Sequence, residues 1–434
     1  MLDHIKNNSI YYLFILLPLT YLIGISITEL TVIVLIIYFF FRNRDFDFLK
    51  DRKFIFLLFI SFFFGINAFF QIDDDLKISS IFHFRYVIFV LSVLFCLNYF
   101  EKIDLNIKKN TFYVVYIITS LVLFDAIFQF LIGENLLGYK ILKNRISGVF
   151  QDELVLGSFL IKIAPFLTWM VFYSKIDIHK NQKKLIIFFS FYIICIFLSG
   201  ERTSFGLSLF YFSGIIIFLN QLRKIFTISL LFLLFFIILT SFLNIGKSDP
   251  GNRIFIRTFH QITNHYFITN NNREIIQKDK NIKREDIKKN ILIFSKDHTG
   301  HYQLAFELFK ENPIFGVGPK GFRYYCRKVN YDPKIGICST HPHNFLVQIT
   351  SETGLIGLSL YSYIIFFLIF KLFKCINLNT SSENKKPFMI ISIGLLVNLF
   401  PFLPSGNFFN NWLSIILYYY VGFYLYSFNS LKKL

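Results

Sequence analysis

Residues 338–357 have the sequence Cys-Ser-Thr-His-Pro-His-Asn-Phe-Leu-Val-Gln-Ile-Thr-Ser-Glu-Thr-Gly-Leu-Ile-Gly, in which a polar segment gives way to an apolar one. His341 and His343 flank a proline at this boundary. The apolar run predicts a helix, and Asn344 and Gln348 would lie on one face of it. Polar atoms inside a membrane are costly unless they face a bundle interior or a cavity. The stretch therefore predicts one wall of a reaction site at a membrane surface.

The composition of the chain predicts a membrane protein. Of its 434 residues, 54% are hydrophobic, and 60 are phenylalanine. The apolar residues come in blocks of roughly 15 to 25, the length at which a helix spans a bilayer. We therefore predict an all-α, polytopic membrane helix bundle of about twelve transmembrane helices. The expected spans lie near residues 10–25, 28–41, 54–70, 86–100, 111–132, 156–174, 185–199, 204–220, 225–243, 344–370, 387–403 and 411–428.

The basic residues predict the orientation of these spans. In a soluble protein, the formal net charge of +18 would be compatible with binding to nucleic acid. Here lysine and arginine concentrate in every second short connecting segment, beginning with the N-terminal one, as they do in cytoplasmic loops. We therefore expect both termini to be cytoplasmic, and we expect no nucleic-acid partner.

This topology divides the chain into three regions. The first nine spans occupy residues 1–243, a long polar loop occupies residues 244–342, and the last three spans occupy residues 343–434. The loop is expected on the outer, periplasmic side. Its two cysteines, Cys326 and Cys338, would then lie in an oxidising compartment, and we predict that they form a disulfide.

Three glycines near the end of this loop, Gly316, Gly318 and Gly321, do not follow a strand of a βαβ unit. A nucleotide-binding loop is therefore not predicted. We expect these glycines to permit a tight turn that folds back on the helix bundle.

Basic residues on the outer side are candidates for anion binding. Arg202 lies between two apolar spans with almost no loop, and Arg145 lies on a short outer loop that leads into a span. A guanidinium near hydrocarbon is costly unless it snorkels or meets an anion, and two of them can hold a diphosphate by bidentate hydrogen bonds. Lys162, about one turn into the sixth span, either joins them or snorkels outward. Glu201 directly precedes Arg202, and we expect it to neutralise that arginine in part.

The two histidines allow three interpretations. A neutral imidazole can act as a general base near working pH. The pair can also contribute to a metal site, for which Asp73–Asp75 is the acidic cluster expected on the same side, or His341 can be satisfied by backbone groups. We favour the base and choose His343, because it adjoins Asn344, which is expected to cap the tenth span. No metal and no cofactor are predicted.

Four motifs occur along the chain in a fixed order. They are Arg145-Ile-Ser-Gly-Val-Phe with Leu156-Gly157, Ser199-Gly-Glu-Arg-Thr, Asn312-Pro-Ile-Phe-Gly-Val-Gly-Pro-Lys-Gly-Phe322, and His341-Pro-His-Asn-Phe-Leu with Glu352-Thr-Gly-Leu-Ile-Gly. Together they resemble the O-antigen ligase / O-antigen polymerase superfamily of bacterial inner-membrane proteins. The resemblance covers most of residues 110–405.

The resemblance implies a metal-independent, inverting glycosyltransferase with its active site at the periplasmic face of the inner membrane. The implied donor is a glycan on undecaprenyl diphosphate, and the implied acceptor is a lipid A-core or another glycan, with membrane lipids as surroundings. The expected site residues are, for catalysis, His343, Arg202 and Arg145 and, for substrate binding, His341, Asn344, Lys162 and Gln348.

Three alternatives stay open. Lipopolysaccharide O-antigen ligases, repeat-unit polymerases and protein O-oligosaccharyltransferases share these motifs, so the resemblance does not distinguish among them. A glycolipid flippase would also need arginines in a cavity, although it would be expected to carry charge deeper in its spans. A metal-dependent transferase built on Asp73–Asp75 would be sensitive to chelators.

Overall fold

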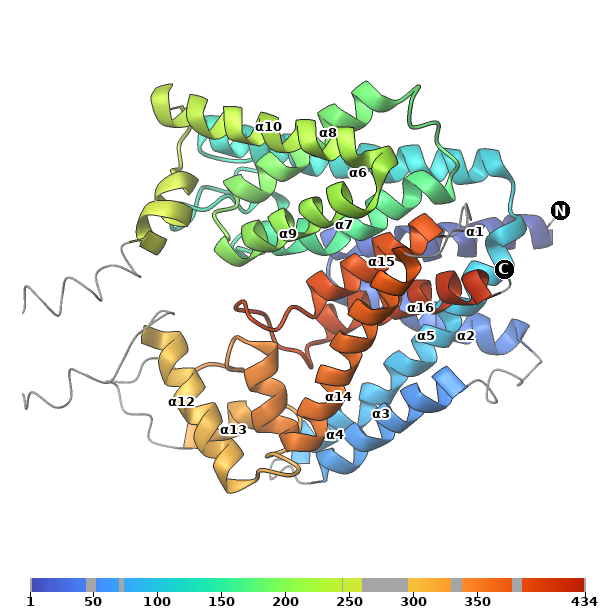
Figure 1. The fold of residues 1–434 in the computed structure, drawn as a ribbon, viewed down its shortest axis with the longest axis vertical. Helices are drawn as coiled ribbons and strands as arrows, with labels where there is room; N and C mark the ends of the chain where they lie inside the picture. The colour runs from blue at the N-terminus through green and yellow to red at the C-terminus, as the bar shows by residue number, and fades with distance from the viewer. Residues whose placement is uncertain are drawn as a thin grey trace, which may run out of the picture.

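The computed structural model describes residues 2–43, 52–69, 74–243, 245–259, 296–328, 338–376 and 385–432. This part of the chain is helical and contains no β-strand, which confirms the all-α prediction (Figure 1). The main helices are α1 (Leu2–Leu16), α2 (Ile25–Arg42), α3 (Arg52–Ala68), α4 (Asp74–Ile81), α5 (Arg85–Tyr99), α6 (Leu105–Ile132), α7 (Leu156–Tyr173), α8 (Gln182–Leu198), α9 (Arg202–Phe218), α10 (Asn220–Leu243), the short π-helix η6 (Asn252–Ile256), α12 (Lys296–Glu311), α13 (Gly321–Lys328), α14 (Phe345–Ile376), α15 (Lys385–Asn398) and α16 (Asn411–Lys432).

Among the described residues, 6 helices are long and apolar enough to cross a membrane. These are Ile25–Arg42, Phe82–Lys102, Leu105–Ile132, Leu156–Tyr173, Asn220–Leu243 and Phe345–Ile376, with Asn8–Leu22 and Arg202–Phe218 as shorter apolar helices. The membrane character is confirmed. The number of twelve spans stays a prediction.

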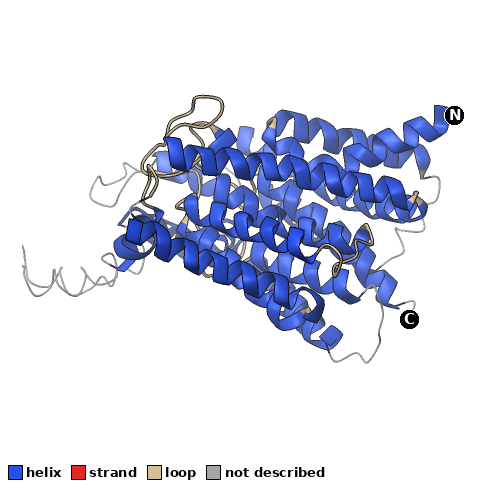
Figure 2. Ribbon diagram, turned by 90° about the horizontal axis from the view of Figure 1, so that it is seen from above, coloured by secondary structure: helices blue, strands red, loops and turns tan. Residues whose placement is uncertain are grey.

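The two chain termini lie near the same end of the bundle in both views (Figure 1, Figure 2). The end of α10 and the start of α12 lie toward the opposite end (Figure 1). The predicted topology requires this arrangement, because it places both termini on one side and residues 244–342 on the other. Which side is cytoplasmic stays a prediction.

α7 lies at the centre of the bundle because nearly all of its faces are apolar, and a helix of this kind is buried on every side. Its side chains Phe159, Phe166 and Trp169 are fully or almost fully buried. Pro165 lies inside the helix, and it packs on Gly394 of α15 so closely that a Cβ at Gly394 would lie 2.5 Å from the Cβ of Pro165. α7 is thus buried at the centre of the bundle, and two of the cavities described below lie near its two ends.

α14 is interrupted at Gly354, where the backbone leaves the helical region with a φ of 65° and a ψ of −163°. The loop that contains Gly316 approaches α14 at this point. A Cβ on Gly354 would lie 2.2 Å from the carbonyl oxygen of Ile314, and a Cβ on Gly316 would lie 2.4 Å from the carbonyl carbon of Glu352. Glycine is therefore required on both sides of the contact, because any side chain would overlap backbone atoms.

Glu352 fastens the same loop to α14. Its carbonyl oxygen accepts a hydrogen bond from the Gly318 amide at 2.9 Å. Its buried carboxylate accepts hydrogen bonds from the amides of Lys320 and Phe322 at 3.0 and 3.1 Å. The predicted fold-back of the loop is confirmed, and the two motifs that contain Gly316 and Glu352 form one structural unit.

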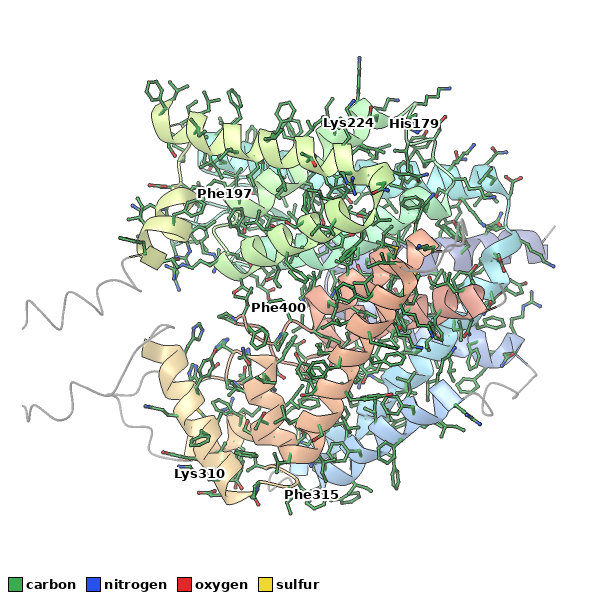
Figure 3. The ribbon with its side chains drawn as sticks, viewed as in Figure 1. His179, Phe197, Lys224, Lys310, Phe315 and Phe400 are labelled. Carbon is green, nitrogen blue, oxygen red and sulfur yellow. A yellow bond between two sulfur atoms is a disulfide. The ribbon has the colours of Figure 1, made fainter. Side chains whose placement is uncertain are left out.

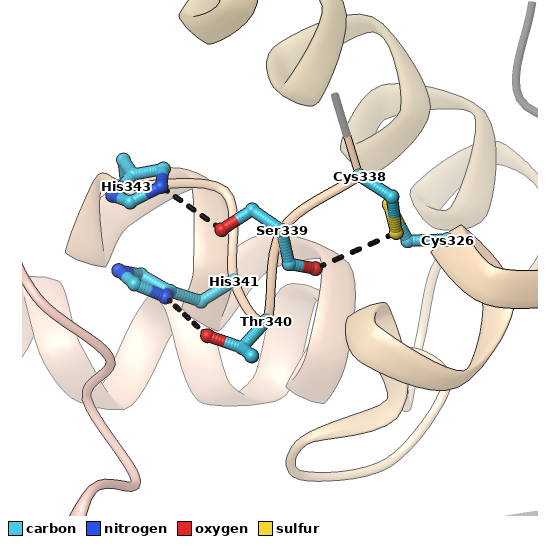
Figure 4. Close-up of a disulfide and its surroundings, with 6 residues drawn as sticks. All are labelled: Cys326, Cys338, Ser339, Thr340, His341 and His343. Carbon is cyan, nitrogen blue, oxygen red and sulfur yellow. Dashed lines mark hydrogen bonds between the residues drawn. A yellow bond between two sulfur atoms is a disulfide. The ribbon is translucent and has the colours of Figure 1, made fainter. Parts of the chain in front are cut away.

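Cys326 of α13 and Cys338 form the predicted disulfide, with their Cα atoms 5.6 Å apart (Figure 4). A small hydrophobic cluster that includes Leu304, Leu308 and Phe322 packs α12 against α13. The disulfide and this cluster together hold the start of the histidine motif beside α12.

Candidate active site

A cavity of about 870 Å³ lies among α7, α9, η6 and the segment between α15 and α16, and residues from several distant parts of the chain line it. Phe400, which forms part of its apolar wall, lies between α9 and the α12–α14 region (Figure 3). The charged residues of the lining are Arg145, Lys162, Arg202, Arg253 and a single carboxylate, Glu201. The cavity is therefore strongly positive and suits an anionic group.

Arg145 is restrained on the loop that leads into α7. Its Nη2 donates a hydrogen bond to the Leu154 carbonyl at 2.6 Å, and its Nε donates to the Ser199 carbonyl at 3.4 Å. Nη2 also lies 3.4 Å from a carboxylate oxygen of Glu201. These contacts hold the guanidinium in place before any substrate binds.

The partial neutralisation of Arg202 by Glu201 stays a prediction, whereas the structure pairs Glu201 with Arg145. The reason is the start of α7, whose first amides need an acceptor. Glu201 accepts hydrogen bonds from the amides of Gly157 and Ser158 at 2.8 and 3.1 Å. A carboxylate at a helix N-terminus is also favoured by the helix dipole, so the side chain turns toward α7.

Arg202 and Arg253 are linked by two hydrogen bonds, each from the side chain of one arginine to the backbone of the segment that contains the other. The Nε of Arg202 donates to the Arg253 carbonyl at 3.0 Å, and the Nε of Arg253 donates to the Gly200 carbonyl at 3.0 Å. Burial, followed by the positive charges of Arg145, Arg202 and Arg257, lowers the pKa of the Arg253 guanidinium. Like charges this close repel one another, and an anion bound between them would relieve the repulsion.

Sequence analysis missed Arg253. It lies in Asn252–Ile256, directly after the ninth predicted span, and was treated as part of a long polar loop. The available signal was a basic residue beside apolar neighbours at the outer end of a span. A π-helix, which is frequent at functional sites, could not be anticipated from the sequence pattern.

Lys162 also lines the cavity, nearly two helical turns inside α7. Its ammonium donates a hydrogen bond to the side-chain oxygen of Asn398 of α15 at 3.3 Å. Of the two alternatives considered for Lys162, the structure places it with the arginines.

His341 and His343 have different surroundings (Figure 4). His341 is buried, with one ring nitrogen 3.0 Å from the Thr340 hydroxyl and the other 3.3 Å from the Ser405 carbonyl oxygen. His343 is only half-buried, and its Nε2 lies 2.9 Å from the Ser339 hydroxyl. Burial lowers the pKa of His341 to about 4. Burial and then the neighbouring histidines lower the pKa of His343 to about 3.

His298 and His301 of α12 extend the pair to a group of four imidazoles. The ring centroid of His343 lies 5.2 Å from that of His298, 5.4 Å from that of His301 and 4.1 Å from that of His341. His298 also lines the cavity. Sequence analysis missed both α12 histidines, although their spacing of three residues on an amphipathic helix places them on one face.

The described residues include no group of three or more histidine, cysteine, aspartate or glutamate side chains that could hold a metal ion. The acidic alternative, Asp73–Asp75, has side chains that lie outside the described residues.

Asn344 caps α14 as predicted, since its side-chain oxygen accepts a hydrogen bond from the Val347 amide at 3.0 Å. Its side-chain nitrogen donates to the Pro401 carbonyl at 2.9 Å, which ties the histidine motif to the segment after α15. Gln348 is fully buried and donates to the Asn407 side chain at 2.9 Å. The structure thus places Gln348 in a network that joins α14 to the segment before α16.

Residues 187–362 match a family model described as O-antigen ligase. This region of the chain is similar to the O-antigen ligase family. This match supports the resemblance found in the motifs, and it indicates a membrane enzyme of the O-antigen ligase or polymerase type. No curated protein matches the chain.

The region that matches the family model supplies only part of the cavity. Arg202, Arg253 and the imidazole group lie inside residues 187–362, whereas Arg145 and Lys162 precede that range. The candidate site is therefore assembled across the boundary of the matched region by the packing of α7 against α9 and α15.

Proposed function

We propose that the protein transfers a glycan from undecaprenyl diphosphate to a hydroxyl of a lipid A-core or similar acceptor. The transfer takes place at the periplasmic face of the inner membrane, with inversion at the anomeric carbon and without a metal ion. The observation that carries this proposal is that the arginines and the histidine group lie next to each other at one cavity. Arg145, Arg202 and Arg253 line one cavity, and His298, in the same lining, lies beside His343.

The arginines have the chemistry that the donor requires. When the bond between the anomeric carbon and the diphosphate breaks, negative charge grows on the leaving oxygen. A guanidinium stabilises such an oxygen strongly because it forms two parallel hydrogen bonds with a phosphate group. Because hydrogen bonds to backbone carbonyls already restrain Arg145 and Arg202, little reorganisation is needed when the charge develops.

His343 takes the proton of the acceptor hydroxyl as the hydroxyl oxygen attacks the anomeric carbon. The new bond joins the acceptor oxygen to the sugar, the bond to the diphosphate breaks, and undecaprenyl diphosphate leaves. His343 suits this role better than His341, because His341 is 9% exposed and contacts Thr340 and Ser405 through its two ring nitrogens.

His298 and His301 position His343 and keep it neutral. Burial first, and then the three imidazoles whose ring centroids lie 4.1 to 5.4 Å from that of His343, disfavour a positive charge on it. A neutral imidazole is the form that accepts a proton. The group of four therefore helps to keep His343 in the form that can accept a proton.

The test is transfer by purified protein from a polyprenyl-diphosphate glycan to an acceptor, with and without a chelator. His343→Ala is expected to abolish turnover, and the matched control Arg223→Ala, which removes an exposed cation in the first turn of α10, is expected to retain it. Near-normal turnover by His343→Ala would exclude the general-base role. Loss of wild-type turnover with the chelator would favour a metal-dependent transferase, and lipid movement without transfer would favour a flippase.

Glycan analysis of a deletion strain separates the two activities of the superfamily. Loss of all attached chains is expected for a ligase. A single attached repeat unit would instead identify a polymerase, for which the same cavity would accept a glycan in place of the lipid A-core.

A further inference from the structure

A second cavity, of about 570 Å³, lies at the other end of α7 from the arginine cavity. α7 has 18 residues. At 1.5 Å per residue the helix is roughly 27 Å long, close to the thickness of the hydrocarbon core of a bilayer, so its two ends are expected near opposite membrane surfaces. His179, which lines the second cavity, lies toward the end of the bundle that holds the chain termini (Figure 3). We infer that this cavity binds the phosphate of an anionic phospholipid head group.

Three lysines from separate segments give this cavity its charge. Lys108 lies near the start of α6, Lys175 follows α7, and Lys386 lies at the start of α15. Glu101 is the acidic residue of the lining, and Lys108 donates to its backbone carbonyl at 2.7 Å. The lysines therefore outnumber the carboxylate, and a bound phosphate would balance the excess.

Aromatic rings hold two of the ammonium groups at the cavity. The Lys108 ammonium lies 4.7 Å from the centre of the Tyr173 ring, and the Lys386 ammonium lies 5.8 Å from that of Phe172. The ring of Trp169 stacks on Tyr173 at 4.3 Å. Tryptophan and tyrosine are enriched at the level of lipid head groups, and their rings attract cations. The combination suits the membrane interface.

Lys175 and Ser427 provide two further observations. Lys175 follows α7 with a φ of 49°, a left-handed conformation that favours glycine, so this lysine occupies a position where its backbone is strained. Ser427 of α16 lines the cavity and is 2% exposed. Its hydroxyl makes no hydrogen bond to any residue in the described part of the chain, so it is a donor that a phosphate oxygen can satisfy.

A lipid is a better occupant than a soluble phosphate because of where the cavity lies. It lies at the opposite end of α7 from the proposed transfer site, and because α7 is about one hydrocarbon thickness long, the head groups of the opposite leaflet are expected near that end. Anionic lipids bind in basic pockets of this kind between membrane helices.

The test uses the full-length protein in phosphatidylcholine nanodiscs that contain increasing phosphatidylglycerol, with retained lipids counted by native mass spectrometry. A variant with Lys108→Gln, Lys175→Gly and Lys386→Gln is expected to bind phosphatidylglycerol on the order of a hundredfold more weakly, because each lysine near an anionic lipid contributes about fivefold. The matched control carries Lys183→Gln and Lys184→Gln, which remove two exposed lysines of α8 outside the cavity, and is expected to bind like the wild type.

Lys175→Gly alone separates loss of charge from loss of folding. Glycine fits the left-handed conformation, so this variant should be at least as stable to heat as the wild type and still bind phosphatidylglycerol more weakly. Undiminished retention of phosphatidylglycerol by the triple variant would overturn the proposal. Equal retention of phosphatidylcholine, or full displacement by inorganic phosphate at matched concentration, would overturn the assignment to an anionic lipid.

Discussion

At the scale of single residues, Arg202 and Arg253 are the cations whose loss tests the anion site. Each guanidinium donates a hydrogen bond to a backbone carbonyl of the segment that carries the other arginine. Replacing either by alanine should lower kcat/KM on the order of a hundredfold or more, as is usual when one charge-stabilising donor is lost. Replacement by lysine should recover only part of the loss, since an ammonium keeps the charge but not the planar fork. Equal rates for the lysine and wild-type proteins would show that bidentate contacts are not used.

The pH dependence of turnover tests the group of four histidines. The pKa of His343 is lowered to about 3, so the neutral, proton-accepting form is present above that pH and is lost only as the pH falls through that value. The kcat/KM profile should therefore show no acid limb near the usual histidine pKa of about 6.5.

Replacing His298 and His301 with asparagine removes two neighbours whose charges lower this pKa. Because burial, the largest cause of the lowered pKa, persists in this variant, the pKa of His343 should rise only in part, and the acid limb should move to higher pH. An unchanged kcat/KM–pH profile in the double variant would mean that His298 and His301 do not influence the pKa of His343 and that α12 only packs against the histidine motif.

At the scale of elements, the interruption of α14 depends on Gly354. Gly354→Ala places a Cβ against the backbone of Ile314 in a left-handed conformation, so it should destabilise the protein by at least about 1–3 kcal/mol. Thermal unfolding in detergent would measure the change. The matched control is Gly65→Ala in α3, where nothing lies within 4 Å of the added Cβ. If both variants unfold at the same temperature, the contact between the Gly316 loop and α14 contributes little to the stability of the protein.

The disulfide between Cys326 and Cys338 is a second contact that stabilises the loop before α14. It closes a loop with a sequence separation of 12 residues. Replacing both cysteines with serine should lower the free energy of unfolding by roughly 3 kcal/mol, by the chain-entropy model. Reductant should destabilise the wild type similarly and leave the double variant unchanged. Two alkylatable thiols in non-reduced protein would contradict the bridge.

At the scale of the whole molecule, the positions of the termini test the topology. Both lie toward one end of the bundle, away from the start of α12 (Figure 1). Reporter fusions should therefore give a cytoplasmic signal at Leu434 and a periplasmic signal at Lys296. A cytoplasmic signal from Lys296 would place the arginine cavity on the wrong side of the membrane for the proposed donor.

The sequence by itself determined the features that depend on local pattern. Runs of apolar residues can be stable only as helices in a bilayer, so the membrane class followed from composition. Asn344 caps α14 because a side-chain acceptor beside an apolar run satisfies the nearby amides. The pairing of Cys326 with Cys338 followed because these are the two cysteines of one loop.

Only the tertiary structure decided which side chains meet. Glu201 neighbours Arg202 in the sequence, yet the unsatisfied amides of α7 draw it to Arg145. Arg253 and His298 enter the site because the chain returns to the bundle after α10 and before α14. These contacts join segments far apart in the sequence, and the packing that brings them together has no periodicity along the chain from which it could be predicted.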